Sequence, residues 1–233
     1  MRVAPSAQNA ERLSYLALRQ AVGWIALLLP IALPIPLCLM HQYPLPPSIS
    51  DYYYTGMRNL LVGSLCAIGL FNFCARGYDL RDTIAGVLSA LCAIGVAFCP
   101  TTPSMTLDCP VPQNALLGNV HWALAAVLFV VLAYMCMVLF TSTAKDRELT
   151  RQKLARNRVY IICGSVMLAS MLVMTALKVG VIFKWWGENT TIAGIGTTFC
   201  FEATALVAFG IAWLVKGETF LKDEPAERGK HPR

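Results

Sequence analysis

The sequence predicts an all-α membrane protein, a polytopic bundle of six transmembrane helices with both chain ends in the cytoplasm. Hydrophobic residues make up 57% of the 233-residue chain and charged residues only 14%, whereas a soluble domain carries about a quarter charged residues. The apolar residues gather in stretches close to the ~20 residues that a membrane helix needs. These stretches are residues 21–40, 59–75, 83–99, 119–140, 159–183 and 192–215.

The first stretch differs from the others because it contains Pro30, Pro34 and Pro36. Proline removes a backbone donor and clashes with the preceding helical turn, so we expect its second half to be kinked or unwound. The apolar run is longer than that of a secretory signal and no small-residue cleavage site follows it. We therefore expect the first span to be retained. The longest stretch, residues 159–183, is expected to tilt.

The positive charges predict the orientation of the spans. Most of the 19 Lys and Arg residues fall in the N-terminal arm, the second and fourth connections and the tail, with Arg58, Lys178 and Lys184 on or near the other side. The positive-inside rule then places both termini in the cytoplasm. Contact with anionic membrane lipids explains these charges, and nothing in them favours a nucleic-acid partner. Residues 1–216 form one transmembrane domain, residues 217–233 a polar cytoplasmic tail, and oligomerisation stays open.

The first outward connection carries an unusual set of polar residues. Three tyrosines follow Asp51, and Arg58 stands seven residues after that carboxylate; the tyrosines are Tyr52, Tyr53 and Tyr54. One interpretation is structural, with Asp51 capping a helix and the tyrosines lying at the membrane–water interface. The other is that this connection folds over the helix ends and lines a ligand pocket.

Later spans add ionisable residues at a similar depth. His121 and Trp122 open the fourth span, while Lys178 and Glu202 lie inside the fifth and sixth. A charge at such depth costs a few kcal/mol unless it pairs or reaches water. A Lys178–Glu202 ion pair is the simplest solution; snorkelling of the lysine with a hydrogen-bonded or protonated glutamate is the alternative.

Two further sites are expected in the outward connections. Cys99 and Cys109 flank one loop and are expected to form a disulfide in an oxidising compartment. Zinc is a candidate cofactor, because a catalytic zinc ion takes three protein ligands and a water. Its candidate ligands are His41, His121, Asp51 and Glu202.

The order of short motifs resembles a known family. Ser48-Ile-Ser-Asp51-Tyr-Tyr-Tyr-Thr, then Arg58, Val62-Gly63, Pro100-Thr-Thr-Pro103 and Gly118-x-x-His121 are similar to the uncharacterised six-span bacterial membrane proteins related to the DRAM/Sfk type. The resemblance implies six helices, an outward Ile-Ser-Asp connection and a bacterial inner membrane, but no agreed activity. The chain lacks the His-x-x-x-His pair of the intramembrane zinc hydrolases.

Three functions fit these residues. The first is a receptor, sensor or binding protein whose outward pocket holds a lipid-like or small amphiphilic ligand. Its predicted lining is Asp51, Tyr52, Tyr53, Tyr54, Arg58, His121, Trp122, Lys178 and Glu202. The second is an intramembrane hydrolase or transferase with His121, Asp51 and Glu202 as catalytic residues. The third is a proton- or ion-coupled transporter that uses Lys178 and Glu202.

Overall fold

The structure, a computed structural model, describes residues 5–74, 79–103, 114–142, 150–185, 191–192 and 195–221. Apart from two strands of two residues each, its regular structure is helical, which confirms the all-α prediction. The elements are α1 (Pro5–Ala32), α2 (Pro34–Leu39), the 3₁₀ helix η1 (Ser50–Tyr54), α3 (Arg58–Cys74), α4 (Leu80–Phe98), α5 (Ala115–Tyr134), the π-helix η2 (Met135–Leu139), α6 (Arg151–Ile182), β1 (Thr191–Ile192), β2 (Ile195–Gly196) and α7 (Thr197–Lys216).

Five helical segments are long and apolar enough to cross a membrane. They are Leu13–Leu39, Leu80–Phe98, Ala115–Leu139, Arg151–Ile182 and Thr197–Lys216. The remaining apolar helix, α3, is shorter, with 17 residues. Large aliphatic side chains such as Leu91, Ile162 and Leu172 are exposed on the outside of the bundle. An apolar exterior of this extent is typical of a surface that faces lipid.

The prolines of the first span act as expected. The first helix ends at Ala32, and a separate helix, α2, begins at Pro34. Pro30 lies inside α1, two residues before this break. Because Pro34 has no backbone N–H and constrains the residue before it, the α-helical ladder is interrupted there. The interruption turns the chain toward the connection that leads to η1.

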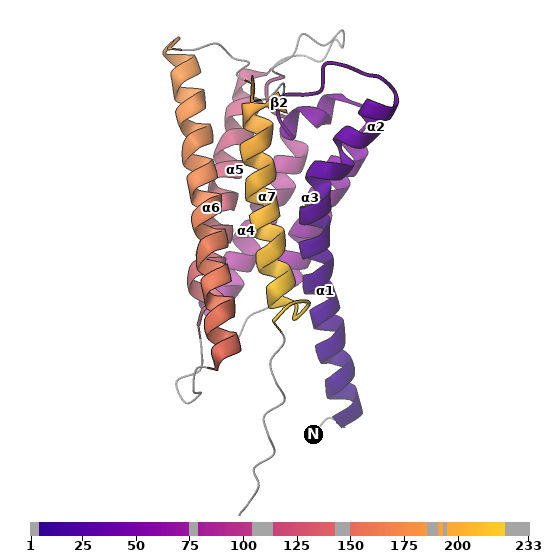
Figure 1. The fold of residues 1–233 in the computed structure, drawn as a ribbon, viewed down its shortest axis with the longest axis vertical. Helices are drawn as coiled ribbons and strands as arrows, with labels where there is room; N and C mark the ends of the chain where they lie inside the picture. The colour runs from indigo at the N-terminus through magenta and orange to yellow at the C-terminus, as the bar shows by residue number, and fades with distance from the viewer. Residues whose placement is uncertain are drawn as a thin grey trace, which may run out of the picture.

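The long helices form a closed ring (Figure 1). Each of α1, α3, α4, α5, α6 and α7 contacts the next along the chain, and α7 returns to contact α1. The closure is tight because glycines meet: a Cβ atom built at Gly210 would lie 2.8 Å from the carbonyl oxygen of Gly23 and 2.9 Å from the nitrogen of Leu27. Small residues allow membrane helices to approach closely in this way.

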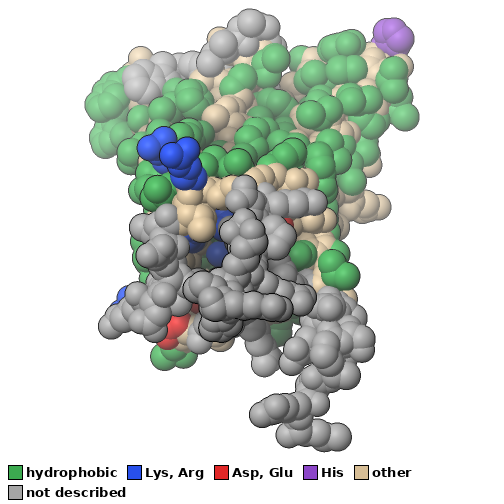
Figure 2. Space-filling model, turned by 60° about the horizontal axis from the view of Figure 1, so that its bottom comes forward, with side chains coloured by type: hydrophobic (Ala, Val, Ile, Leu, Met, Phe, Trp, Pro, Cys, Tyr) green, Lys and Arg blue, Asp and Glu red, His purple; other side chains and the backbone are tan. Residues whose placement is uncertain are grey.

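The two ends of the ring differ. The η1 end carries α2, η1 and the β1–β2 pair, while the opposite end, here the tail end, carries the start of α1 and the end of α7 (Figure 1). At the tail end the Gln20 amide donates to the Gly217 carbonyl over 2.8 Å and the Lys153 ammonium donates to the Phe140 carbonyl over 3.0 Å. Figure 2 turns this end forward and shows Lys and Arg side chains among hydrophobic ones.

The contact between α1 and α7 yields a prediction. Gly210→Ala is expected to destabilise the protein by about 1–3 kcal/mol, because the added methyl group meets the backbone of α1 and pushes the two helices apart. Reversible unfolding in detergent measures the loss. Gly63→Ala is the matched control, since nothing lies within 4 Å of a Cβ atom at Gly63. Equal stability of the two variants would contradict this packing.

Candidate ligand-binding site

The site at the η1 end is built on the segment 47–54, which folds back onto the start of α7. The Phe199 N–H donates to the Pro47 carbonyl over 2.9 Å. Gly196 approaches Pro47 so closely that a side chain there would collide with the Pro47 backbone. Ser48 then starts η1, because its hydroxyl accepts from the Ser50 N–H and its carbonyl accepts from the Asp51 N–H. These local hydrogen bonds bring the hydroxyls of Ser48 and Ser50 to the side of the turn that faces α7.

The Glu202 carboxylate of α7 holds this segment. One oxygen accepts hydrogen bonds from the Ser48 hydroxyl at 2.8 Å and from the Ile49 N–H at 2.5 Å. The other oxygen accepts from the Ser50 hydroxyl at 3.1 Å. Three donors therefore surround a carboxylate that a membrane interior would otherwise penalise. These hydrogen bonds from the η1 segment thus offset the free-energy cost of placing the carboxylate inside a membrane helix.

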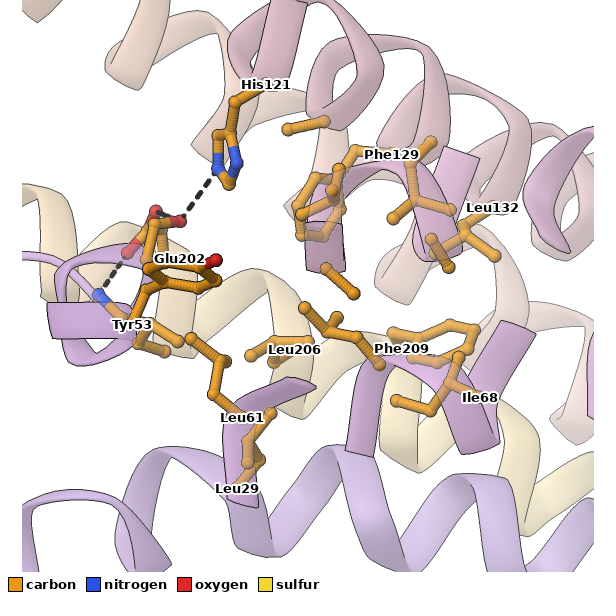
Figure 3. Close-up of a pocket in the computed structure, with 18 of the residues that line it drawn as sticks. Leu29, Tyr53, Leu61, Ile68, His121, Phe129, Leu132, Glu202, Leu206 and Phe209 are labelled. Carbon is orange, nitrogen blue, oxygen red and sulfur yellow. Dashed lines mark hydrogen bonds between the residues drawn. The ribbon is translucent and has the colours of Figure 1, made fainter. Parts of the chain in front are cut away.

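His121 of α5 completes the polar centre, as Figure 3 shows. Its Nδ1 atom lies 2.6 Å from the Cys99 carbonyl and its Nε2 atom 3.1 Å from the Ser50 hydroxyl. A carbonyl oxygen only accepts, so Nδ1 carries a proton and donates it. The Ser50 hydroxyl has a single proton, which points either to the Glu202 carboxylate or, when its O–H rotates, to the Nε2 atom of a neutral imidazole. The Ser50 hydroxyl consequently lies between an imidazole and a carboxylate.

Two cavities meet at this polar centre. The smaller, about 80 Å³, extends into the ring between α1, α3, α4, α5 and α7 and is mostly apolar. The larger, about 370 Å³, lies between α5, α6, α7 and the segment that leads into η1. Ser50, His121 and Glu202 line both cavities. Ala125 and Phe129 also line both, so polar and apolar side chains share the junction between the two spaces.

Several predicted ligand-binding residues do line the cavities. Asp51 is buried and lines the larger cavity with Trp122 and Lys178, while Tyr53 lines the smaller one. The Lys178 ammonium lies 4.9 Å from the centre of the Trp122 ring, a favourable cation–π position. The predicted Lys178–Glu202 ion pair is not formed, because Glu202 takes its partners from the η1 segment.

The other predicted residues lie apart from the two cavities. Tyr52 is fully buried against Phe199, and burial raises its pKa to about 12. Tyr54 donates to the Thr101 carbonyl. Burial also raises the pKa of Tyr54, so both phenols are neutral near pH 7 and support the connection rather than act as bases. Arg58 is exposed and lies over the Tyr53 ring, 4.2 Å from its centre.

The candidate metal ligands are only partly brought together. His41 is exposed and lines neither cavity, whereas Asp51, His121 and Glu202 line the larger one. Among the described residues no group of three or more His, Cys, Asp or Glu side chains could hold a metal ion. The predicted disulfide of Cys99 involves Cys109, which lies outside the described residues.

Ser48 and Ser50 are the functional candidates that sequence reasoning missed. A serine in a polar connection has many roles, and nothing local marks it as a partner of distant groups. The spacing of the two serines could have indicated their role, because Ser48 and Ser50 flank one residue directly before Asp51. Serines with this spacing favour a turn and bring two hydroxyls close together. Their meeting with Glu202, more than 150 residues away, depends on closure of the ring.

Comparisons with protein-family models, with curated proteins and with solved structures yielded no match.

The hydrogen bonds of Glu202 generate a prediction. Glu202→Gln is expected to lower stability by about 1–3 kcal/mol, because the charge-assisted hydrogen bonds from Ser48 and Ile49 become neutral ones and an amide N–H group replaces the oxygen that accepts from Ser50. Thermal unfolding in detergent measures the change, and limited proteolysis reports release of the segment 41–57. Asp82→Asn, the corresponding carboxylate-to-amide change in the first turn of α4, is the control. A fully stable Glu202→Gln protein with an intact connection would show that the carboxylate does not hold the segment.

Proposed function

We propose that this chain is an integral membrane protein that binds a small amphiphile at the η1 end. One observation carries the proposal: an apolar cavity and a larger cavity that also holds several polar and charged side chains adjoin at Ser50, His121 and Glu202. A hydrocarbon chain fits the first space, and a head group fits the second. Pockets of this kind, mostly apolar with a few convergent polar groups, are typical of small-molecule sites.

The lining of each cavity supports a division of the ligand into tail and head. The deep wall of the smaller cavity is aliphatic and aromatic, as Figure 3 shows for Leu61, Ile68, Leu132, Leu206 and Phe209. Apolar cavities stay dry and favour apolar groups.

The larger cavity offers an ammonium, an imidazole and an indole face, from Lys178, His121 and Trp122. Lys178 favours a head group that is anionic or rich in oxygen acceptors. Asp51 and Glu202 line the same cavity, so a head group that also presents a hydroxyl donor has acceptors available. This chemistry supports a receptor, sensor or carrier of a single-chain lipid over a transporter, which needs two alternative access routes.

The proposal includes a sixth span and an orientation. At about 1.5 Å per residue, the 17 residues of α3 extend about 25 Å, the lower end of what a membrane helix requires. Six spans place both termini on one side, and the Lys and Arg residues of the tail end favour the cytoplasm. The η1 end then faces outward, as expected for the six-span bacterial family that the sequence resembles and for a bacterial inner membrane.

Ligand binding is tested by filling the apolar cavity. Leu206→Trp is expected to weaken binding of dansyl-undecanoic acid, a fluorescent single-chain amphiphile, by at least about tenfold, because the indole occupies the space of the tail. Fluorescence titration in nanodiscs of zwitterionic lipid measures the affinity. Leu172→Trp, at a position 70% exposed on the outside of α6, is the control. Equal affinity of both variants, or no binding by the parent protein, would refute the proposal.

The orientation is tested with green fluorescent protein, which becomes fluorescent in the cytoplasm but not after export in unfolded form. Fusions to either chain end are both expected to fluoresce in a bacterial host, since six spans return the chain to its starting side. Fluorescence of one fusion alone would indicate an odd number of spans and would exclude α3 as a span.

A further inference from the structure

We infer that the site is also a hydrolase of fatty-acyl esters, in which Ser50 is the nucleophile and His121 the general base. This inference rests on the proposed amphiphile site, since the same two cavities would hold the acyl chain and the head group. It adds a reaction to that site and assigns a role to a residue that sequence reasoning did not select.

The first argument is the geometry of Ser50 and His121. The Ser50 Oγ and His121 Nε2 atoms lie 3.1 Å apart, within the range expected of a nucleophile and its base. The Cys99 carbonyl, 2.6 Å from Nδ1, fixes the tautomer that leaves Nε2 free to take the serine proton. In serine hydrolases a carboxylate has this orienting role; here a backbone carbonyl at the end of α4 has it.

The second argument is the position of Glu202. One oxygen of its carboxylate is 3.1 Å from the same Ser50 hydroxyl. The Ser50 oxygen therefore lies between this negative charge and the imidazole of His121. An imidazolium that forms during the reaction is stabilised by that charge in surroundings of low polarity. Glu202 is then a positioning residue: at rest it accepts the Ser50 proton and keeps the hydroxyl oxygen beside His121, and when the O–H rotates toward Nε2 the carboxylate balances the charge of His121 without taking part in bond formation.

The third argument is access to both parts of an ester. Ser50 lines the smaller and the larger cavity at once. A carbonyl carbon that joins a hydrocarbon chain to a polar alcohol would stand at the junction, next to the hydroxyl. Lys178 lines the larger cavity and supplies a positive charge toward an oxyanion that develops there.

The reaction balances with water as the second reactant. Ser50 Oγ bonds to the acyl carbon while its proton passes to His121 Nε2, and the tetrahedral oxyanion collapses with cleavage of the ester C–O bond. His121 returns the proton to the departing alkoxide, which leaves as an alcohol. Water then attacks the acyl-serine, again giving a proton to His121, and the products are a carboxylic acid and the regenerated Ser50 hydroxyl.

The test uses a biotin-tagged fluorophosphonate with an alkyl chain, which phosphonylates an activated serine. Incubation with the full-length protein in nanodiscs, followed by peptide mass spectrometry, is expected to find the adduct on Ser50. Ser50→Ala is expected to abolish labelling, and His121→Gln to slow it by about 100-fold or more, the usual contribution of a general base. Ser89→Ala is the matched control, because the Ser89 hydroxyl donates to the Gly86 carbonyl within α4 and lines neither cavity.

The dansyl-undecanoic acid titration on the same samples separates the possible failures. Retained binding by Ser50→Ala shows that this variant is folded, so its loss of labelling then reports chemistry. Binding of the fatty acid without any labelling of Ser50 would overturn the hydrolase and leave the binding function standing. Labelling of Ser48, or unchanged labelling in His121→Gln, would also overturn it. Absence of both binding and labelling would reject the binding function together with the hydrolase.

Discussion

One partly buried carboxylate, that of Glu202, organises the η1 end of this protein. Glu202 lies in a helix that is apolar enough to cross a membrane, where an unpartnered charge is costly. The chain meets that cost with three donors from consecutive residues, Ser48, Ile49 and Ser50. Because these donors belong to the connection between α2 and α3, the carboxylate draws the connection onto α7 and thereby covers the ring of helices.

The consequences of this contact extend across the bundle. With the segment in place, the Ser50 hydroxyl reaches His121 of α5, whose other ring nitrogen is held by the end of α4. Three helices and one connection thus share a hydrogen-bonded chain at the mouth of an apolar cavity. Closure of the ring depends separately on small residues, since Gly23 and Gly210 allow α1 and α7 to meet. Packing therefore creates the enclosed space, and the polar chain defines its entrance.

The sequence predicted the elements better than their contacts. Hydropathy located the apolar part of each long helix, and Pro34 marked the break after α1, because both depend on local properties. It missed the polar first turns, since α1 begins at Pro5 and α6 at Arg151, well before the predicted starts at residues 21 and 159. The last predicted span began at residue 192, whereas α7 begins at Thr197, since the preceding residues pair as β1 and β2. The depth of Lys178 and Glu202 was predictable, but their lateral neighbours were not. Only the ring order places Glu202 against Ser48 and Lys178 against Trp122.

A double-mutant cycle between Ser48 and Glu202 tests the central contact most directly. The free energy of unfolding in detergent is measured for the parent protein, Ser48→Ala, Glu202→Leu and the double variant, since leucine leaves the Ser48 hydroxyl no acceptor at this position. If the hydroxyl and the carboxylate interact as described, the coupling energy should be about 1 kcal/mol or more. Additive effects, with a coupling energy near zero, would show that Glu202 does not hold the η1 segment and would remove the basis of the site.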